Sequence, residues 1–197
     1  MKKLGMTMLF AVVYFCCVGL GVLLANVIDH TGNMFYAPAC SAFVGGLAYW
    51  YFVERIRTFG AITFVGLVLA GFFLLTRHGA GAFLPAIICG LLADVISRMG
   101  RYKNSPEQAI SFFVFAFGTT GPILMMWFAR ADYIASLLAR GKSQAYIDRV
   151  MVAPDIRNIL LFVVATLIGA VVGSIIGHLW TSYRRTATKI EILDTEE

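Results

Sequence analysis

The chain has 197 residues, of which 59% are hydrophobic and 14% charged, with a formal net charge of +5. A water-soluble domain usually carries about 25% charged residues. This composition therefore excludes an ordinary soluble globule and leaves lipid as the solvent for much of the surface. The positive charge does not indicate nucleic-acid binding, because the cytoplasmic loops of membrane proteins also collect Lys and Arg.

Six apolar segments follow one another along the chain and predict an all-α polytopic membrane protein with six transmembrane helices. Each segment approaches the roughly 20 residues that cross a bilayer as a helix, and backbone groups in lipid must be paired within such a helix. The segments are 7–28, 37–53, 59–75, 81–97, 109–129 and 158–180. We expect one membrane domain over 1–185 and a cytoplasmic tail over 186–197.

The distribution of Lys and Arg predicts that both termini lie in the cytoplasm. In that orientation ten basic residues lie inside and six outside, and five of those six belong to the long segment 130–157. Cytoplasmic loops are enriched in Lys and Arg, and short loops count most. We therefore expect a multi-pass protein of the cell membrane with the N-terminus and the C-terminus inside.

The segment 130–157 alternates charged and apolar residues at near-helical spacing, and Gly141 divides it. This pattern predicts two short amphipathic helices across the outer mouth, between the fifth and sixth spans. They are either interfacial helices that meet lipid phosphates or a lid over a ligand cavity. Within the fifth span, Pro122 should kink the helix. The carbonyl groups that the kink releases either face a cavity or are paired by Thr119 and Thr120.

Small residues recur every four positions in the last span, at Ala165, Gly169, Gly173 and Gly177. Such rows let two helix backbones approach closely. Similar small residues lie in the first two spans, and they pack either internally or against a partner protein. The residues that we assign to a partner interface are Gly21, Ala25, Ser41 and Gly45.

The ionisable residues do not form an enzyme motif. Asp94 is the acidic residue that lies well inside a span, and we expect it to pair with Arg98 one turn later rather than to act in function. His30 and His78 fall in outer loops, where they are either ordinary polar residues or ligands of a metal or a haem iron. The motifs of metalloproteases and serine hydrolases are absent, so we expect no enzyme activity.

Several stretches in fixed order resemble the Trep_Strep family of integral membrane proteins. They are Gly90 to Arg98 (GLLADVISR), Gly121-Pro122, Trp127 to Arg130 (WFAR), Tyr133 to Gly141 and the glycine-rich last span. The resemblance covers roughly residues 8–185. It implies a substrate-binding S component of an energy-coupling factor (ECF) ABC importer, a class of six-helix proteins with both ends inside.

The resemblance further implies what the protein binds. Its partners would be a transmembrane coupling protein and two cytoplasmic ATPases, and its small-molecule substrate would be a micronutrient captured at the outer face. No resident cofactor is expected, but haem or a metal ion is one candidate for the transported ligand, with His30 and His78 as its ligands. The implied substrate-binding residues, whose two arginines could grip an anionic ligand, are Asp29, His30, Asn33, Tyr36, Arg77, His78, Arg130, Asp132 and Tyr133.

Two other interpretations stay open from the sequence. One is an integral membrane enzyme that acts on a lipid-linked substrate, with Asp94 and the histidines as catalytic groups. The other is a transporter that works without ATPases. Uptake in cells that lack the coupling protein would favour this last interpretation.

Overall fold

The computed structural model describes residues 2–79 and 81–194, with the side chains of 3–79 and 81–187, and the fold is helical. Each of the six apolar segments forms helix, so the predicted all-α class is confirmed. The elements are α1 (Lys2–Ile28), α2 (Ala37–Ile56), α3 (Ala61–Leu75), α4 (Leu84–Met99), α5 (Ser105–Ala116), the 3-10 turn η1 (Phe117–Thr120), α6 (Gly121–Phe128), α7 (Arg130–Ala139), α8 (Gln144–Val150) and α9 (Ile156–Asp194).

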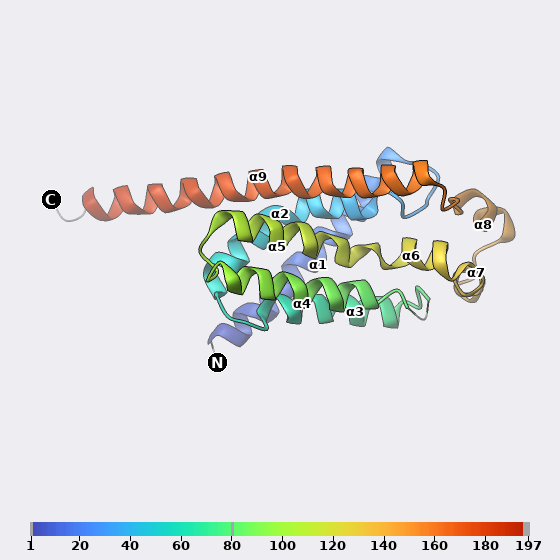
Figure 1. The fold of residues 1–197 in the computed structure, drawn as a ribbon, viewed down its shortest axis with the longest axis horizontal. Helices are drawn as coiled ribbons and strands as arrows, with labels where there is room; N and C mark the ends of the chain where they lie inside the picture. Colours follow the sequence, from blue (N-terminus) through green and yellow to red (C-terminus); the bar gives the residue numbers. More distant parts are fainter. Residues whose placement is uncertain (1, 80, 195–197) are drawn as a thin grey trace.

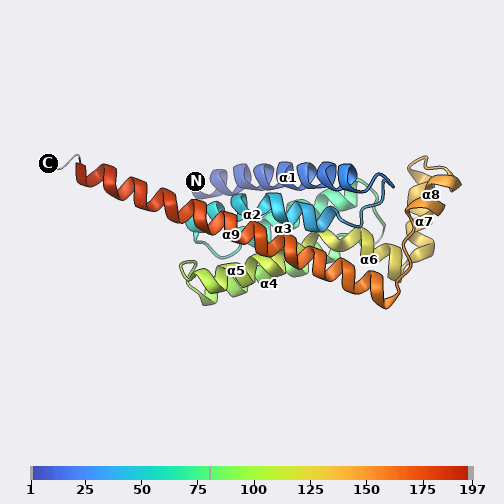
Figure 2. The ribbon, with the colours of Figure 1, turned by 90° about the horizontal axis from the view of Figure 1, so that it is seen from above.

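The helices α1 to α6 and α9 run along the long axis of a bundle (Figure 1). The beginning of α1 and the C-terminal end of α9 lie at one end, which we call the terminal end. The helices α7 and α8 lie across the opposite end, which we call the distal end, and Figure 2 shows them standing beyond the tips of the bundle helices. The two ends of the chain therefore share one side of the bundle.

Within the described residues, length and composition identify two helices that can cross a membrane, over Lys3–Ile28 and Ile156–Ala187. The pair Ser105–Thr119 and Gly121–Phe128 forms a third span if its two bent parts are taken together. The outward faces of these helices are apolar, with Leu23 64% and Leu179 62% exposed. A continuous apolar surface of this kind is unfavourable in water and suits lipid, so the composition and the fold agree on a membrane protein.

The helix α2 lies between α1 and α9 and packs closely on both. A methyl group added at Gly173 would collide with the carbonyl oxygen of Ala42, and one at Gly177 would lie 2.7 Å from the carbonyl oxygen of Gly46. The glycines of α9 thus let its backbone contact the backbone of α2. The small-residue row of the last span therefore serves internal packing.

The predicted kink in the fifth span is confirmed as a break between α5 and α6. The two parts are bent by 54°, and the tighter turn η1 joins them. Pro122 lacks an amide hydrogen and lies in the first turn of α6, where that hydrogen is not needed. The hydroxyl groups of Thr119 and Thr120 donate to the carbonyl oxygens of Ala116 and Phe117 beside the break.

The prediction of two short helices separated at Gly141 is also confirmed. α7 ends at Ala139 and α8 begins at Gln144, while Gly141 has a φ of +75° that suits glycine. The proposed boundary between span and tail at residue 185 does not mark the end of a helix, because α9 continues to Asp194. The last residues of the predicted tail, 195–197, lie outside the described residues.

Candidate functional site

An apolar cavity of about 200 Å³ lies in the distal half of the bundle. Its walls come from α1, the loop 29–36, the first turn of α2, the last turn of α3, the loop 76–83, and the break between η1 and α6. The break between η1 and α6 contributes Thr119, Pro122 and Ile123 to these walls. The lining residues are Phe15, Val18, Gly19, Val22, Met34, Ala37, Pro38, Ser41, Phe72, Phe73, His78, Thr119, Pro122 and Ile123.

The polar side chains of the lining are few, and two of them are already hydrogen-bonded to backbone. Ser41 donates to the carbonyl oxygen of Val18 at 3.2 Å, and Thr119 donates to that of Ala116 at 3.0 Å. His78 is the titratable residue among those that line the cavity. The cavity therefore offers a ligand an apolar wall and one imidazole.

A hydrogen bond with Thr76 holds the ring of His78 in place. The Thr76 hydroxyl oxygen lies 2.6 Å from the carbonyl oxygen of Phe72 and 2.6 Å from Nδ1 of His78. The hydroxyl has one hydrogen, so either it donates to Phe72 and accepts from Nδ1, or it donates to Nδ1. In the first arrangement of a neutral ring, Nε2 has a lone pair that can accept a hydrogen bond or bind a metal.

The surroundings of His78 keep its ring neutral. The residue is 7% exposed. Burial, followed by the positive charge of Arg140, lowers the pKa of His78 to about 4. The imidazole is therefore uncharged at neutral pH and has one nitrogen that can accept a hydrogen bond.

Four predicted binding residues in the loop 29–36 do not line the cavity. Asp29 and Asn33 accept hydrogen bonds from the backbone amides of Thr31 and Phe35, so they shape their own loop. Tyr36 lies edge-on against Phe35, and His30 is exposed. The loop instead contributes Met34, an apolar residue that the sequence analysis did not select.

The predicted binding residues next to α3 and on α7 also lie outside the cavity wall, except His78. Arg77, Arg130 and Asp132 are exposed, and Tyr133 is buried in the core without lining the cavity. Burial raises the pKa of Tyr133. Of the nine residues implied by the resemblance, the structure therefore places His78 alone in the cavity wall.

Metal binding by the two outer histidines together is not supported. His30 is exposed and absent from the cavity that His78 lines. Among the described residues, no group of three or more His, Cys, Asp or Glu side chains lies close enough to hold a metal ion. The imidazole of His78 would be the residue available in this cavity to bind a metal that the substrate itself carries.

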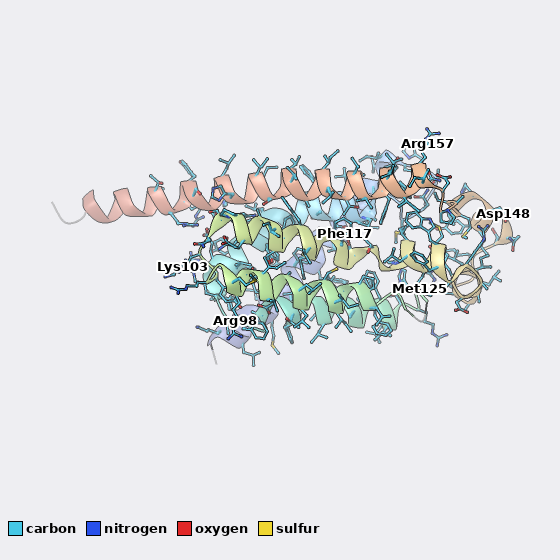
Figure 3. All side chains as sticks on the ribbon, viewed as in Figure 1. Arg98, Lys103, Phe117, Met125, Asp148 and Arg157 are labelled. Carbon is cyan, nitrogen blue, oxygen red and sulfur yellow. The ribbon has the colours of Figure 1, made fainter. Side chains whose placement is uncertain are left out.

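The short helices of the distal end are tied to the loop that supplies Met34. The hydroxyl of Tyr146 on α8 donates to the carbonyl oxygen of Gly32 at 2.9 Å. Leu137 of α7 and Ile147 of α8 are buried in the main core. Figure 3 shows Asp148 and Arg157 at this end and Arg98 and Lys103 at the terminal end. Thus α7 and α8 cover the bundle without entering the cavity wall.

Asp94 has a structural role that differs from the predicted ion pair. Its Oδ2 accepts hydrogen bonds from the amide of Gly60 at 2.7 Å and from the amide and hydroxyl of Thr63, and its Oδ1 accepts from the Tyr102 hydroxyl at 3.0 Å. Asp94 therefore caps the N-terminus of α3. Arg98 instead lies over the ring of Phe59, 5.0 Å from its centroid.

The four residues assigned to a partner interface are buried between α1 and α2. A methyl group on Gly21 would collide with Ser41, and one on Gly45 would lie 2.8 Å from the ring of Tyr14. Ala25 is 3% exposed and Ser41 1%. In this chain these residues form the contact between two helices, and their assignment to a partner interface stays a prediction.

A family model described as a hypothetical bacterial integral membrane protein, Trep_Strep, matches residues 1–181. No curated protein and no solved structure matches the chain.

Proposed function

Because this chain belongs to the Trep_Strep family of hypothetical bacterial integral membrane proteins, we propose that it is the substrate-binding S component of an ECF-type ABC importer. In this role it resides in the cell membrane and captures a micronutrient at the outer face. A separate coupling protein and two cytoplasmic ATPases then drive release to the inside. The sequence resemblance supports this role, and the distal cavity is the observation that carries it.

The proposed topology has six spans with both termini inside. The spans would be α1, α2, α3, α4, the bent pair of α5 and α6, and α9. The shared end of both termini and the ten basic residues that fall on that side support it. The cavity then lies in the outer half of the membrane, with α7 and α8 on the outer surface.

The cavity favours a small ligand with an apolar body. Its volume of about 200 Å³ lies below the roughly 300 Å³ at which pockets for drug-sized ligands begin. A haem macrocycle would therefore require the cavity to widen. The ligand would place one hydrogen-bond donor, or one metal ion, at the imidazole of His78.

An anionic group on the ligand would not reach a cation inside the cavity. Arg77 and Arg130 are exposed and do not line it. We therefore propose that any charged group of the ligand remains at the outer surface and that the apolar body supplies most of the affinity. This replaces the expectation that two arginines grip a carboxyl group.

The structural hydrogen bonds of Asp94 favour a binding role over an enzyme role. The carboxyl group accepts four hydrogen bonds that join α3, α4 and the turn before α5. A catalytic acid or base needs access to substrate, whereas Asp94 is 0% exposed.

The first experiment is to purify the protein in mild detergent, record its absorbance spectrum and identify co-purified small molecules by mass spectrometry. We expect a stoichiometric small molecule, and a Soret band if it is haem. His78→Gln should weaken its binding by about tenfold, the value of one hydrogen bond to a desolvated partner. His30→Gln is the matched control and should leave affinity unchanged.

Two results would count against the proposal. If wild type and His78→Gln bound the ligand with equal affinity, the ligand would not bind in the distal cavity. Undiminished uptake in cells that lack the coupling protein would instead favour a transporter that needs no ATPases.

A further inference from the structure

A second apolar groove lies between α1, α2 and α9 in the terminal half of the bundle, with a volume of about 470 Å³. Cys17 and Val44 line its deep part, and Leu9, Tyr51 and Trp180 line the part nearer the terminal end. From Leu9 to Cys17 the helix rises ~12 Å at about 1.5 Å per residue. The groove thus runs along the helices toward the surface at which both termini lie.

The groove faces outward from the bundle. Leu9 is 61% exposed, Val13 39% and Leu47 37%, and all three lie on its walls. In a membrane this surface contacts the hydrocarbon chains of the leaflet at the terminal end. An occupant can therefore enter from the lipid without crossing a layer of protein.

The mouth of the groove combines aromatic rings with positive charge. Arg184 lines it, and the guanidinium of Arg55 lies over the ring of Tyr51, 5.1 Å from its centroid. The neighbouring acid Glu54 is paired with Arg185. Trp and Tyr are typical of the boundary between lipid and water, so Tyr51 and Trp180 place the two arginines at headgroup level.

We propose that this groove binds an anionic phospholipid. One acyl chain lies along the apolar wall from Leu9 toward Val44, and the phosphate lies beside Arg55 and Arg184. Guanidinium groups bind phosphate oxygens through charge-assisted hydrogen bonds, and anionic lipids attract basic residues at this level. A lipid without net charge would make the same apolar contacts with the wall but would not neutralise the positive charge of the arginines at the mouth.

The proposal is independent of the transport role, because it involves neither the distal cavity nor a coupling protein. Its consequence is structural. The bound lipid would contact three helices at once, two near the beginning of the chain and one at its end, and would hold the terminal half of the bundle together in the membrane.

The test uses the full-length protein in detergent, titrated with phosphatidylglycerol or phosphatidylcholine and measured by native mass spectrometry. We expect phosphatidylglycerol to bind at least tenfold more tightly than phosphatidylcholine. Arg55→Gln and Arg184→Gln should each reduce this preference by about tenfold. The control is Lys103→Gln, which removes one positive charge at the same end but away from the groove and should change nothing.

A second pair of variants tests the position of the acyl chain. Val44→Phe fills the deep part of the groove and should weaken binding of both lipids by at least fivefold. Val95→Phe enlarges a side chain that is 41% exposed on α4 and should have no effect. Thermal unfolding of each variant in detergent shows whether the fold is kept.

Three outcomes would overturn the proposal. Equal binding of the two lipids would eliminate recognition of the headgroup charge. Competition by excess inorganic phosphate that displaces the lipid completely would assign the site to free phosphate. An unchanged affinity in a folded Val44→Phe variant would place the acyl chain elsewhere.

Discussion

Replacing Asp94 by Ala should destabilise the protein without acting on the distal cavity. The substitution removes the cap of α3, which costs about 1 kcal/mol. It also leaves the buried hydroxyl of Tyr102 without its acceptor, at a cost of about 1–3 kcal/mol. The free energy of unfolding should therefore fall by about 2–4 kcal/mol.

Thermal unfolding in detergent measures this loss. For a chain of this size 1 kcal/mol corresponds to about 2–4 °C in Tm, so Asp94→Ala should lower Tm by about 5–15 °C. Arg98→Ala is the control, because an exposed arginine over an aromatic ring contributes about 0.5–1 kcal/mol. The two variants would have similar effects if the ion pair expected from their spacing were the dominant interaction.

A Tm for Asp94→Ala within 2 °C of the wild type would refute the assignment of Asp94 as a cap. If such a variant also lost ligand binding or transport, Asp94 would have to act in function. Ligand affinity at the distal cavity, measured at a temperature where both proteins are folded, separates these cases. We expect that affinity to stay within twofold.

Three further predictions concern packing, pH and the distal loop. Gly173→Ala should lower the free energy of unfolding by about 1–3 kcal/mol, because the added methyl group collides with Ala42. Gly71→Ala, whose added methyl group has no atom within 4 Å, should be neutral or stabilising. Chemical denaturation in detergent measures both variants. Because the pKa of His78 is lowered to about 4, ligand affinity should be constant from pH 8 to about 5 and fall only near pH 4. A loss of ligand affinity with its midpoint near pH 6.5 would contradict this. Tyr146→Phe removes the hydrogen bond to Gly32, so hydrogen exchange in the loop 29–36 should quicken about fivefold.

The same shift of the His78 pKa has a defined effect on stability. The folded protein binds the proton less readily than the unfolded chain, so the contribution of the neutral ring is fully present above about pH 6.5. It is lost as the pH falls from there toward 4. A Tm that rose on acidification through this window, in the absence of ligand, would contradict the burial of His78.

Local features of the sequence predicted the helices well. The length of the apolar segments predicted the six helical segments. Pro122 predicted the break between α5 and α6, and Gly141 predicted the division between α7 and α8. These features act on the backbone of neighbouring residues, so a single stretch of sequence carries the signal. The glycine spacing of the last span likewise indicated a close helix contact, although not the helix that it meets.

The predicted binding residues and the lining of the cavity share His78 alone, because the residues that form a cavity are distant in sequence. Polar loop residues were selected, and the structure uses Asp29 and Asn33 to form turns and leaves Arg77 and Arg130 exposed. The cavity is lined mainly by apolar residues such as Met34 and Phe73. Nothing in their local pattern distinguishes them from other apolar residues of a membrane helix.

The sequence by itself determined that this chain is a helical membrane protein and where its main helix break and the division of its distal loop lie, because those properties follow from hydropathy and backbone chemistry. The tertiary structure alone decided that Asp94 caps α3, that the small residues of α1 and α2 face each other, and that His78 lines an apolar cavity. Each of these depends on which surfaces pack together, and packing joins residues that the chain separates by tens of positions.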